Sequence, residues 1–140
     1  MELPDSYSSK LVEAAARGDY MLTHALLAWI WIQENSCEVE LPEGFTGNLY
    51  RANAALINND SVVTDLELEA AAFLYLAGQH TLVSTAFAQR VIASQNGDGG
   101  WLLTSDKPGN SDWHPTVLAL FVLSQLEYPA VSYVPMLAGK

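Results

Sequence analysis

The sequence predicts an all-α protein in which helical hairpins repeat along the chain. Apolar residues recur with the period of helices, and no stretch alternates polar and apolar residues as a strand does. Three segments that are apolar nearly all round also align without gaps at a spacing of 45 residues. They cover residues 23–32, 68–77 and 113–122. This period is in the range of helical repeat proteins.

Polar or glycine-containing breaks divide the chain into six predicted helices. The helices cover residues 6–17, 19–35, 47–58, 64–77, 81–94 and 114 onward. Ser6 and the serines after it are N-cap residues for the first helix, and Gly18 ends that helix. A solvated acidic loop that contains Pro42 and Gly44 separates the second helix from the third.

Similar signals delimit the last three predicted helices. The polar run 58–61 stops the third helix and precedes the fourth, which ends at Gly78. The fifth helix is amphipathic, with Phe87 and Val91 among the residues of its apolar side. A glycine-rich loop at 96–112 follows, and Pro115 suits the first turn of the sixth helix.

The alternation of helix types predicts how the repeats stack. The helices before the apolar segments are amphipathic, so each repeat pairs an outer helix with an inner helix that lies between its neighbours. We expect one domain, residues 1–140, with three helical hairpins at about 6–35, 47–78 and 80–127. The tail 128–140 is apolar and uncharged until Lys140, and we expect it to cap one end or to reach across a twofold interface.

Charge and cysteine content exclude several classes of function. Six basic and sixteen acidic residues give a net charge of −10, which repels nucleic acid and anionic lipid surfaces as partners. Cys37 is the only cysteine, so the chain forms neither an internal disulfide nor a zinc finger. The N-terminus lacks the basic and apolar regions of a secretion signal, and these features together predict a cytoplasmic protein.

The loop before the sixth helix contains a compact motif. Residues 95–101 read Gln-Asn-Gly-Asp-Gly-Gly-Trp, which is a Q-x3-G-x-W pattern. The glycines permit backbone conformations that other residues avoid, and they allow a close approach between the tryptophan ring and the glutamine. We interpret the motif as a structural clasp formed by Gln95, Asp98, Gly99, Gly100 and Trp101.

Together with residues 111–120, this motif resembles the repeat of the terpenoid cyclase and protein prenyltransferase superfamily, the α/α-toroid proteins that include the squalene-hopene cyclases. The match covers about residues 82–126, and the two earlier repeats match only in period. The resemblance implies that the Gln95 amide bonds to backbone at a helix end and that the Trp101 ring stacks on it. It also implies a partial, half-toroid fold, because the family closes its ring with more hairpins than this chain has.

The catalytic parts of that family are missing from this chain. The cyclases protonate their substrate with a D-x-D-D motif, and no two aspartates here stand in that spacing. The prenyltransferase zinc site uses an Asp, a nearby Cys and a later His, whereas Cys37 has only glutamates beside it. The resemblance therefore favours a relative that is not an enzyme and that needs no cofactor.

One set of three residues is compatible with a metal site. His24, Glu69 and His114 fall at equivalent positions of the three inner helices, near the N-terminal end of each. Two histidines and one carboxylate with an open position form a ligand set for catalytic zinc or non-haem iron. The alternative is that equivalent residues of a repeat are alike for packing reasons, or that they cap helices.

Aromatic residues of the inner helices suggest a second kind of site. They are Trp29, Trp31, Phe73, Tyr75 and Phe121. Such rings could line a face that binds a small apolar ligand, or they could be ordinary core in a domain this small. We therefore predict a non-catalytic binding or protein-interaction module that acts as a homodimer or with another protein. The alternative is a small metal-dependent enzyme or a lipophilic-ligand-binding protein.

Overall fold

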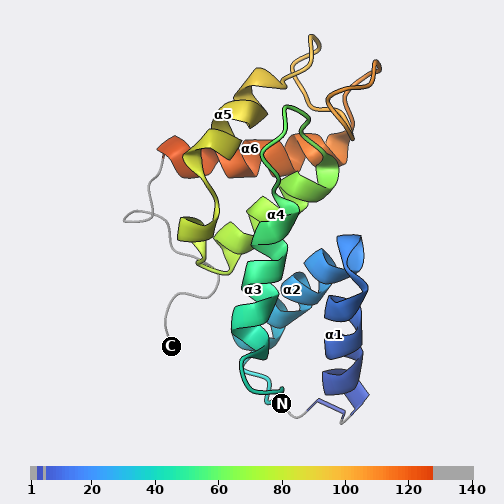
Figure 1. Cartoon of the computed structure of the whole chain (residues 1–140), viewed down its shortest axis with the longest axis vertical. Coiled ribbons are helices and arrows are strands. Elements are labelled where there is room, and N and C mark those ends of the chain that lie inside the picture. Colours follow the sequence, from blue (N-terminus) through green and yellow to red (C-terminus); the bar gives the residue numbers. More distant parts are fainter. Residues whose placement is uncertain (1–2, 5, 128–140) are drawn as a thin grey trace.

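The computed structural model describes residues 3–4 and 6–127, and within them it is all-α (Figure 1). The described part holds six α-helices and no β-strand, which confirms the predicted class. The helices are α1 (Ser6–Arg17), α2 (Asp19–Glu34), α3 (Phe45–Leu56), α4 (Asp65–Leu76), α5 (Thr85–Ala93) and α6 (Trp113–Glu127), with a short 3-10 helix, η1 (His80–Leu82). The tail 128–140, for which we predict either a cap or an arm across a twofold interface, lies outside the described residues.

Helix α4 lies at the centre of the molecule. It contacts α2 and α3 as well as α6, while α1 packs on α2 and α5 packs on α6 (Figure 1). Nine of the 12 residues of α4 are buried, among them the three consecutive alanines 70–72. Alanine has a small side chain, so the neighbouring helices approach the α4 backbone closely from several sides. Every charged group that α4 carries near its start is therefore forced into the interior.

Capping residues decide where two helices begin. Thr64 and Glu67 form a reciprocal capping box at the start of α4. Ser84 accepts a hydrogen bond from the Phe87 backbone and starts α5, with Val83 extended before it. The predicted start of the fifth helix at Thr81 is therefore wrong. That segment forms η1 instead, because the serine cap sets the α-helical start after residue 84.

Helix α3 begins two residues before the predicted start at Gly47. The preceding Gly44 has a φ of 73°, a left-handed conformation that favours glycine, and α3 follows at Phe45. The helix ends at Leu56 rather than Asn58, because Ile57 has extended dihedral angles. These shifts lie within the usual uncertainty of helix ends.

The long loop 95–112 ties together the first turns of α4 and α6. The Asp65 amide donates to the Leu103 carbonyl at 2.9 Å, and the His114 amide donates to the Asp112 carboxylate at 2.9 Å. An isolated β-bridge joins Thr64 to the loop as well. Because both helix starts bond to one loop, their side chains are held in a fixed relation to each other.

Arg90 of α5 anchors the segment that leads into α4. Its guanidinium donates to the carbonyl oxygens of Asn58, Asp60 and Val62, with 2.6 Å to the Asp60 oxygen. Its Nη2 also lies 3.5 Å from Oε1 of Glu67, a residue that is only 2% exposed. The guanidinium thus supplies the positive charge that the buried Glu67 carboxylate needs.

None of the helices in the described ranges is long and apolar enough to span a lipid bilayer.

We predict that Arg90→Gln lowers the free energy of unfolding by about 3 kcal/mol, because it leaves a buried carboxylate without its cation and removes bonds to backbone carbonyls. Chemical denaturation monitored by circular dichroism measures the change. The matched control is Arg51→Gln, since Arg51 is exposed and its guanidinium donates to the side chain of Asn48 on the same helix. The control is expected to stay within about 0.5 kcal/mol of wild type. Equal effects of the two substitutions would show that Arg90 is not an anchor.

Candidate functional site

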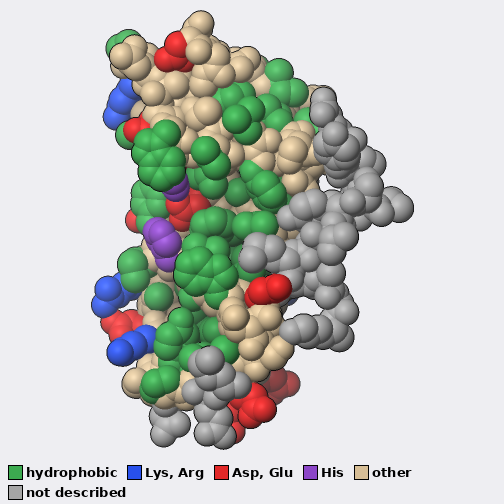
Figure 2. All heavy atoms as spheres, turned by 180° about the vertical axis from the view of Figure 1, so that it is seen from behind, with side chains coloured by type: hydrophobic (Ala, Val, Ile, Leu, Met, Phe, Trp, Pro, Cys, Tyr) green, Lys and Arg blue, Asp and Glu red, His purple; other side chains and the backbone are tan. Residues whose placement is uncertain are grey.

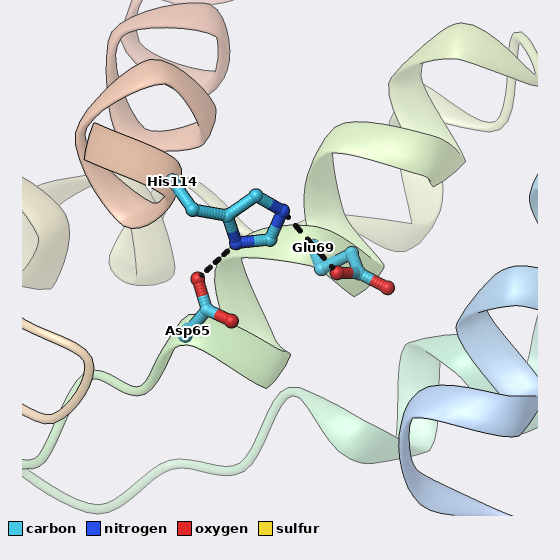
Figure 3. Close-up of side chains that lie close together, drawn as sticks. All are labelled: Asp65, Glu69 and His114. Atoms are coloured by element: carbon cyan, nitrogen blue, oxygen red, sulfur yellow. Dashed lines mark hydrogen bonds and ion pairs between the residues drawn. The ribbon is translucent and has the colours of Figure 1, made fainter. Parts of the chain in front are cut away.

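Three side chains meet where the first turn of α6 approaches the first turns of α4 (Figure 3). Asp65, Glu69 and His114 each offer one metal-ligating atom, and these atoms all lie within 4.8 Å of one another. Nδ1 of His114 is 2.8 Å from Oδ1 of Asp65, and Nε2 of the same ring is 3.7 Å from Oε2 of Glu69. The imidazole therefore bridges two carboxylates that stand one helical turn apart on α4.

The site extends to His24 of α2. Its Nε2 lies 3.9 Å from Oε1 of Glu69, while its Nδ1 is 2.6 Å from the backbone oxygen of Tyr20. The structure thus brings all three residues of the predicted constellation to one place, with Glu69 between the two imidazoles. His24 is not a member of the tightest group, in which Asp65 stands instead.

Two hydroxyl groups from α2 complete the surroundings of the carboxylates. The Thr23 hydroxyl donates to Oε1 of Glu69, and the Tyr20 hydroxyl donates to Oδ2 of Asp65 at 3.0 Å. Burial raises the pKa of Tyr20 to about 12, helped by its hydrogen bond to Asp65 and by the negative charges of Asp65 and Glu69. The phenol therefore stays protonated at neutral pH and remains a donor.

Within the described part of the chain, neither buried carboxylate has a lysine or arginine within ion-pair distance. Asp65 is 4% exposed and Glu69 is 2% exposed. Among the described residues, only histidines pair with them within 4 Å, whereas Arg90 pairs with the neighbouring Glu67. Burying a carboxylate is costly unless positive charge or hydrogen bonds compensate for it. At this site hydroxyl groups and imidazoles take the place of a lysine or arginine.

The predicted clasp forms a hydrogen-bonded unit in the loop 95–112. The Gln95 amide donates to the Gly99 carbonyl at 2.8 Å, and the Trp101 indole donates to the Val91 carbonyl in α5 at 2.8 Å. It is thus the tryptophan that bonds to the helix end, rather than the glutamine as the family resemblance implied. A Cβ atom on Gly100 would lie 2.6 Å from the Cβ atom of Ser111. The close contact between the backbone at position 100 and the Ser111 side chain therefore requires glycine.

Asp98 closes the same loop from the other side. Its carboxylate accepts hydrogen bonds from the hydroxyl and the amide of Ser111, and from the Gly100 amide. These bonds lower the pKa of Asp98 to about 2, with the Ser111 hydroxyl as the largest cause. The ionised form is therefore the one that holds the loop.

The five aromatic residues predicted to line a ligand face do not share one exposed surface. Trp31 is 55% exposed, whereas Tyr75 belongs to the buried core. Trp29 is half-buried and its indole donates to the hydroxyl of Tyr50 in α3 at 3.1 Å. Phe73 and Phe121 are also half-buried against the core. Most of these rings contribute to packing between helices.

Other apolar side chains are exposed on α2 and α6. On α6 they lie at positions 113, 117 and 120, which share one side of a helix, and they are 75%, 58% and 55% exposed. The α2/α6 face is our name for six exposed apolar side chains on these two helices: Tyr20, Met21, Trp31, Trp113, Val117 and Leu120. Figure 2 shows hydrophobic side chains around histidine and acidic groups at the surface. The Trp113 ring also meets the His114 ring edge to face at 5.4 Å.

Two features of this region escaped prediction from the sequence. Asp65 was not singled out, although it precedes Glu69 by four residues and so lies on the same side of the helix. The exposed side of α6 also went unrecognised, because a helix that is apolar all round carries no pattern that distinguishes its buried side from its exposed side.

No protein-family model, curated protein or solved structure matches this chain. The family resemblance therefore rests on the clasp motif and on the 45-residue period. Any function must be inferred from the geometry of the described residues.

We predict that Trp101→Ala lowers the free energy of unfolding by about 3–5 kcal/mol, because it truncates a buried aromatic ring that also bonds to α5. Gln95→Ala is expected to have a smaller effect in the same direction. Leu103→Ala is the matched control, since that side chain lies in the same loop, is 55% exposed, and its truncation is expected to change stability by less than about 1 kcal/mol. Thermal and denaturant unfolding measure all three variants, and an unchanged Trp101→Ala protein would contradict the clasp.

We predict that Asp98→Ala lowers the melting temperature at pH 7 and that this deficit disappears in acid. The folded pKa of about 2 lies below the ordinary value of 3.8, so the ionised carboxylate stabilises the fold above pH 3.8. That contribution is lost as the pH falls from 3.8 through about 2. Melting curves from pH 7 to pH 2 test this, with the exposed Glu38→Ala as control. A deficit that persists unchanged at pH 2 would contradict the assignment.

Proposed function

We propose that this chain is a non-catalytic binding module that associates with a second copy of itself through the α2/α6 face. The observation that supports this is the exposure of large apolar side chains along two helices. Soluble monomers rarely expose contiguous apolar surface without a binding role. Exposed tryptophan is also enriched at protein interfaces.

The distribution of charge favours a second copy as the occupant. The chain carries a net charge of −10, so two copies repel each other over most of their surface. Helix α6 has no lysine, arginine, aspartate or glutamate from Trp113 to Leu126. On α2, the acidic residues stand at the ends, at Asp19 and Glu34. The α2/α6 face is therefore a region where two copies can approach without bringing like charges together.

The resemblance to α/α toroids supports the same proposal. In that arrangement α2, α4 and α6 would be the inner helices of three hairpins, and α4 already contacts the other two. The hydrogen-bonded clasp and the meeting of His24, Glu69 and His114 agree with equivalent positions in three repeats. Three hairpins make part of a ring, so α2 and α6 would each lack a neighbour on one side. A second copy would cover both.

We expect the wild-type protein to be a dimer in sedimentation equilibrium and native mass spectrometry. Leu120→Glu should weaken the dimer by at least about 100-fold in Kd, since it places a charge in an apolar contact. Leu103→Glu is the matched control, because Leu103 is equally exposed but lies in the loop 95–112. Circular dichroism establishes that both variants are folded. A monomeric wild-type protein at millimolar concentration, or equal behaviour of the two variants, would contradict the proposal.

A further inference from the structure

We propose that Glu69, His114 and His24 bind one divalent transition-metal ion of the zinc type, with Asp65 orienting the His114 ring. All four residues belong to one chain, so this site does not require the proposed association with a second copy. The inference rests on ring orientation, on distances and on the balance of charge.

The orientation of both imidazoles suits metal binding. Nδ1 of His114 faces the Asp65 carboxylate at 2.8 Å, and Nδ1 of His24 faces the Tyr20 carbonyl at 2.6 Å. A carbonyl oxygen only accepts a hydrogen bond, and an ionised carboxylate does the same, so both Nδ1 atoms carry the proton. In the neutral rings the lone pair is therefore on Nε2. Metal-ligating histidines are held in this way, by a carboxylate or a backbone carbonyl on the other nitrogen.

The two Nε2 atoms lie near different oxygens of the same buried carboxylate, that of Glu69. The separations are 3.7 Å from His114 to Oε2 of Glu69 and 3.9 Å from His24 to Oε1. Neither is a hydrogen-bond distance. In a tetrahedral zinc site, bonds of about 2.0–2.2 Å place ligand atoms about 3.3–3.6 Å apart. The two nitrogen–oxygen separations at Glu69 are thus slightly longer than those of a zinc ligand set. His24 lies outside the group of ligand atoms within 4.8 Å of one another, so its side chain, which is 58% exposed, would have to move toward Glu69 when the ion binds.

The donor set and the charge both favour a transition metal. Imidazole nitrogens suit zinc, copper, iron and nickel, whereas magnesium and calcium prefer oxygen ligands alone. A divalent cation would also balance the two buried carboxylates of Asp65 and Glu69, for which the described residues provide no lysine or arginine. With both histidines partly exposed, a bound ion would keep a coordination position open to solvent.

The three histidines of the chain allow a direct test on the wild-type protein. Metal-free protein labelled with 15N-histidine is titrated with zinc chloride, and the imidazole nitrogens are followed by long-range 1H–15N correlation. We expect Nε2 of His24 and His114 to shift and to saturate at one zinc per chain, while His80 in η1 does not change. If the cluster is only a network of protonated imidazoles and carboxylates, zinc leaves all three rings unchanged. That result, or a shift of His80 alone, would overturn the proposal.

Calorimetric titration with zinc assigns the roles of the residues. His114→Ala and Glu69→Gln are expected to weaken zinc binding by more than the roughly 10–100-fold that the loss of an outer partner costs, and Asp65→Asn by about that amount. His80→Ala is the matched control and should bind zinc as the wild type does. Circular dichroism checks that each variant is folded. Wild-type zinc affinity in both His114→Ala and Glu69→Gln would overturn the site, whatever the oligomeric state.

Discussion

The arrangement of the molecule depends on the loop 95–112, which ties the starts of α4 and α6 to each other. Its carbonyl at Leu103 bonds to the first residue of α4, and its Asp112 carboxylate caps the first turn of α6. The loop is in turn bonded to α5 through Trp101 and closed by Asp98. Together with the direct packing of α4 against α6, this connection fixes how the two helix starts face each other.

The acidic first turns of α4 illustrate two ways of burying carboxylates. Glu67 faces Arg90, whose positive charge is permanent and whose other donors are used by backbone carbonyls. Asp65 and Glu69 face neutral hydroxyls and imidazoles instead. The first arrangement is structural, since the guanidinium joins the Glu67 carboxylate to the backbone that leads into α4. The second places two imidazole nitrogens within 4 Å of the Glu69 carboxylate without a hydrogen bond to it, and the proposed cation site rests on this arrangement.

The α6 part of the α2/α6 face arises because that helix is apolar on every side. Helix α6 is apolar all round, and one side of it packs against α4 and α5. The opposite side keeps side chains of the same character without a neighbour in the described chain, from Trp113 to Leu120. The Trp113 ring contacts His114, so the exposed apolar surface reaches the edge of the histidine and carboxylate cluster. Binding at either place therefore involves adjoining parts of the same helix.

The sequence alone determined the helical class, the approximate helices and the equivalence of His24, Glu69 and His114, because periodicity and spacing are local properties of the chain. It did not determine the start of α5, which depends on the competition between a serine cap and an overlapping apolar pattern. Nor did it distinguish the buried side of α6 from its exposed side, or place Asp65 beside His114. Those features depend on which helices become neighbours, and only tertiary packing decides that for helices whose apolar residues surround the whole axis.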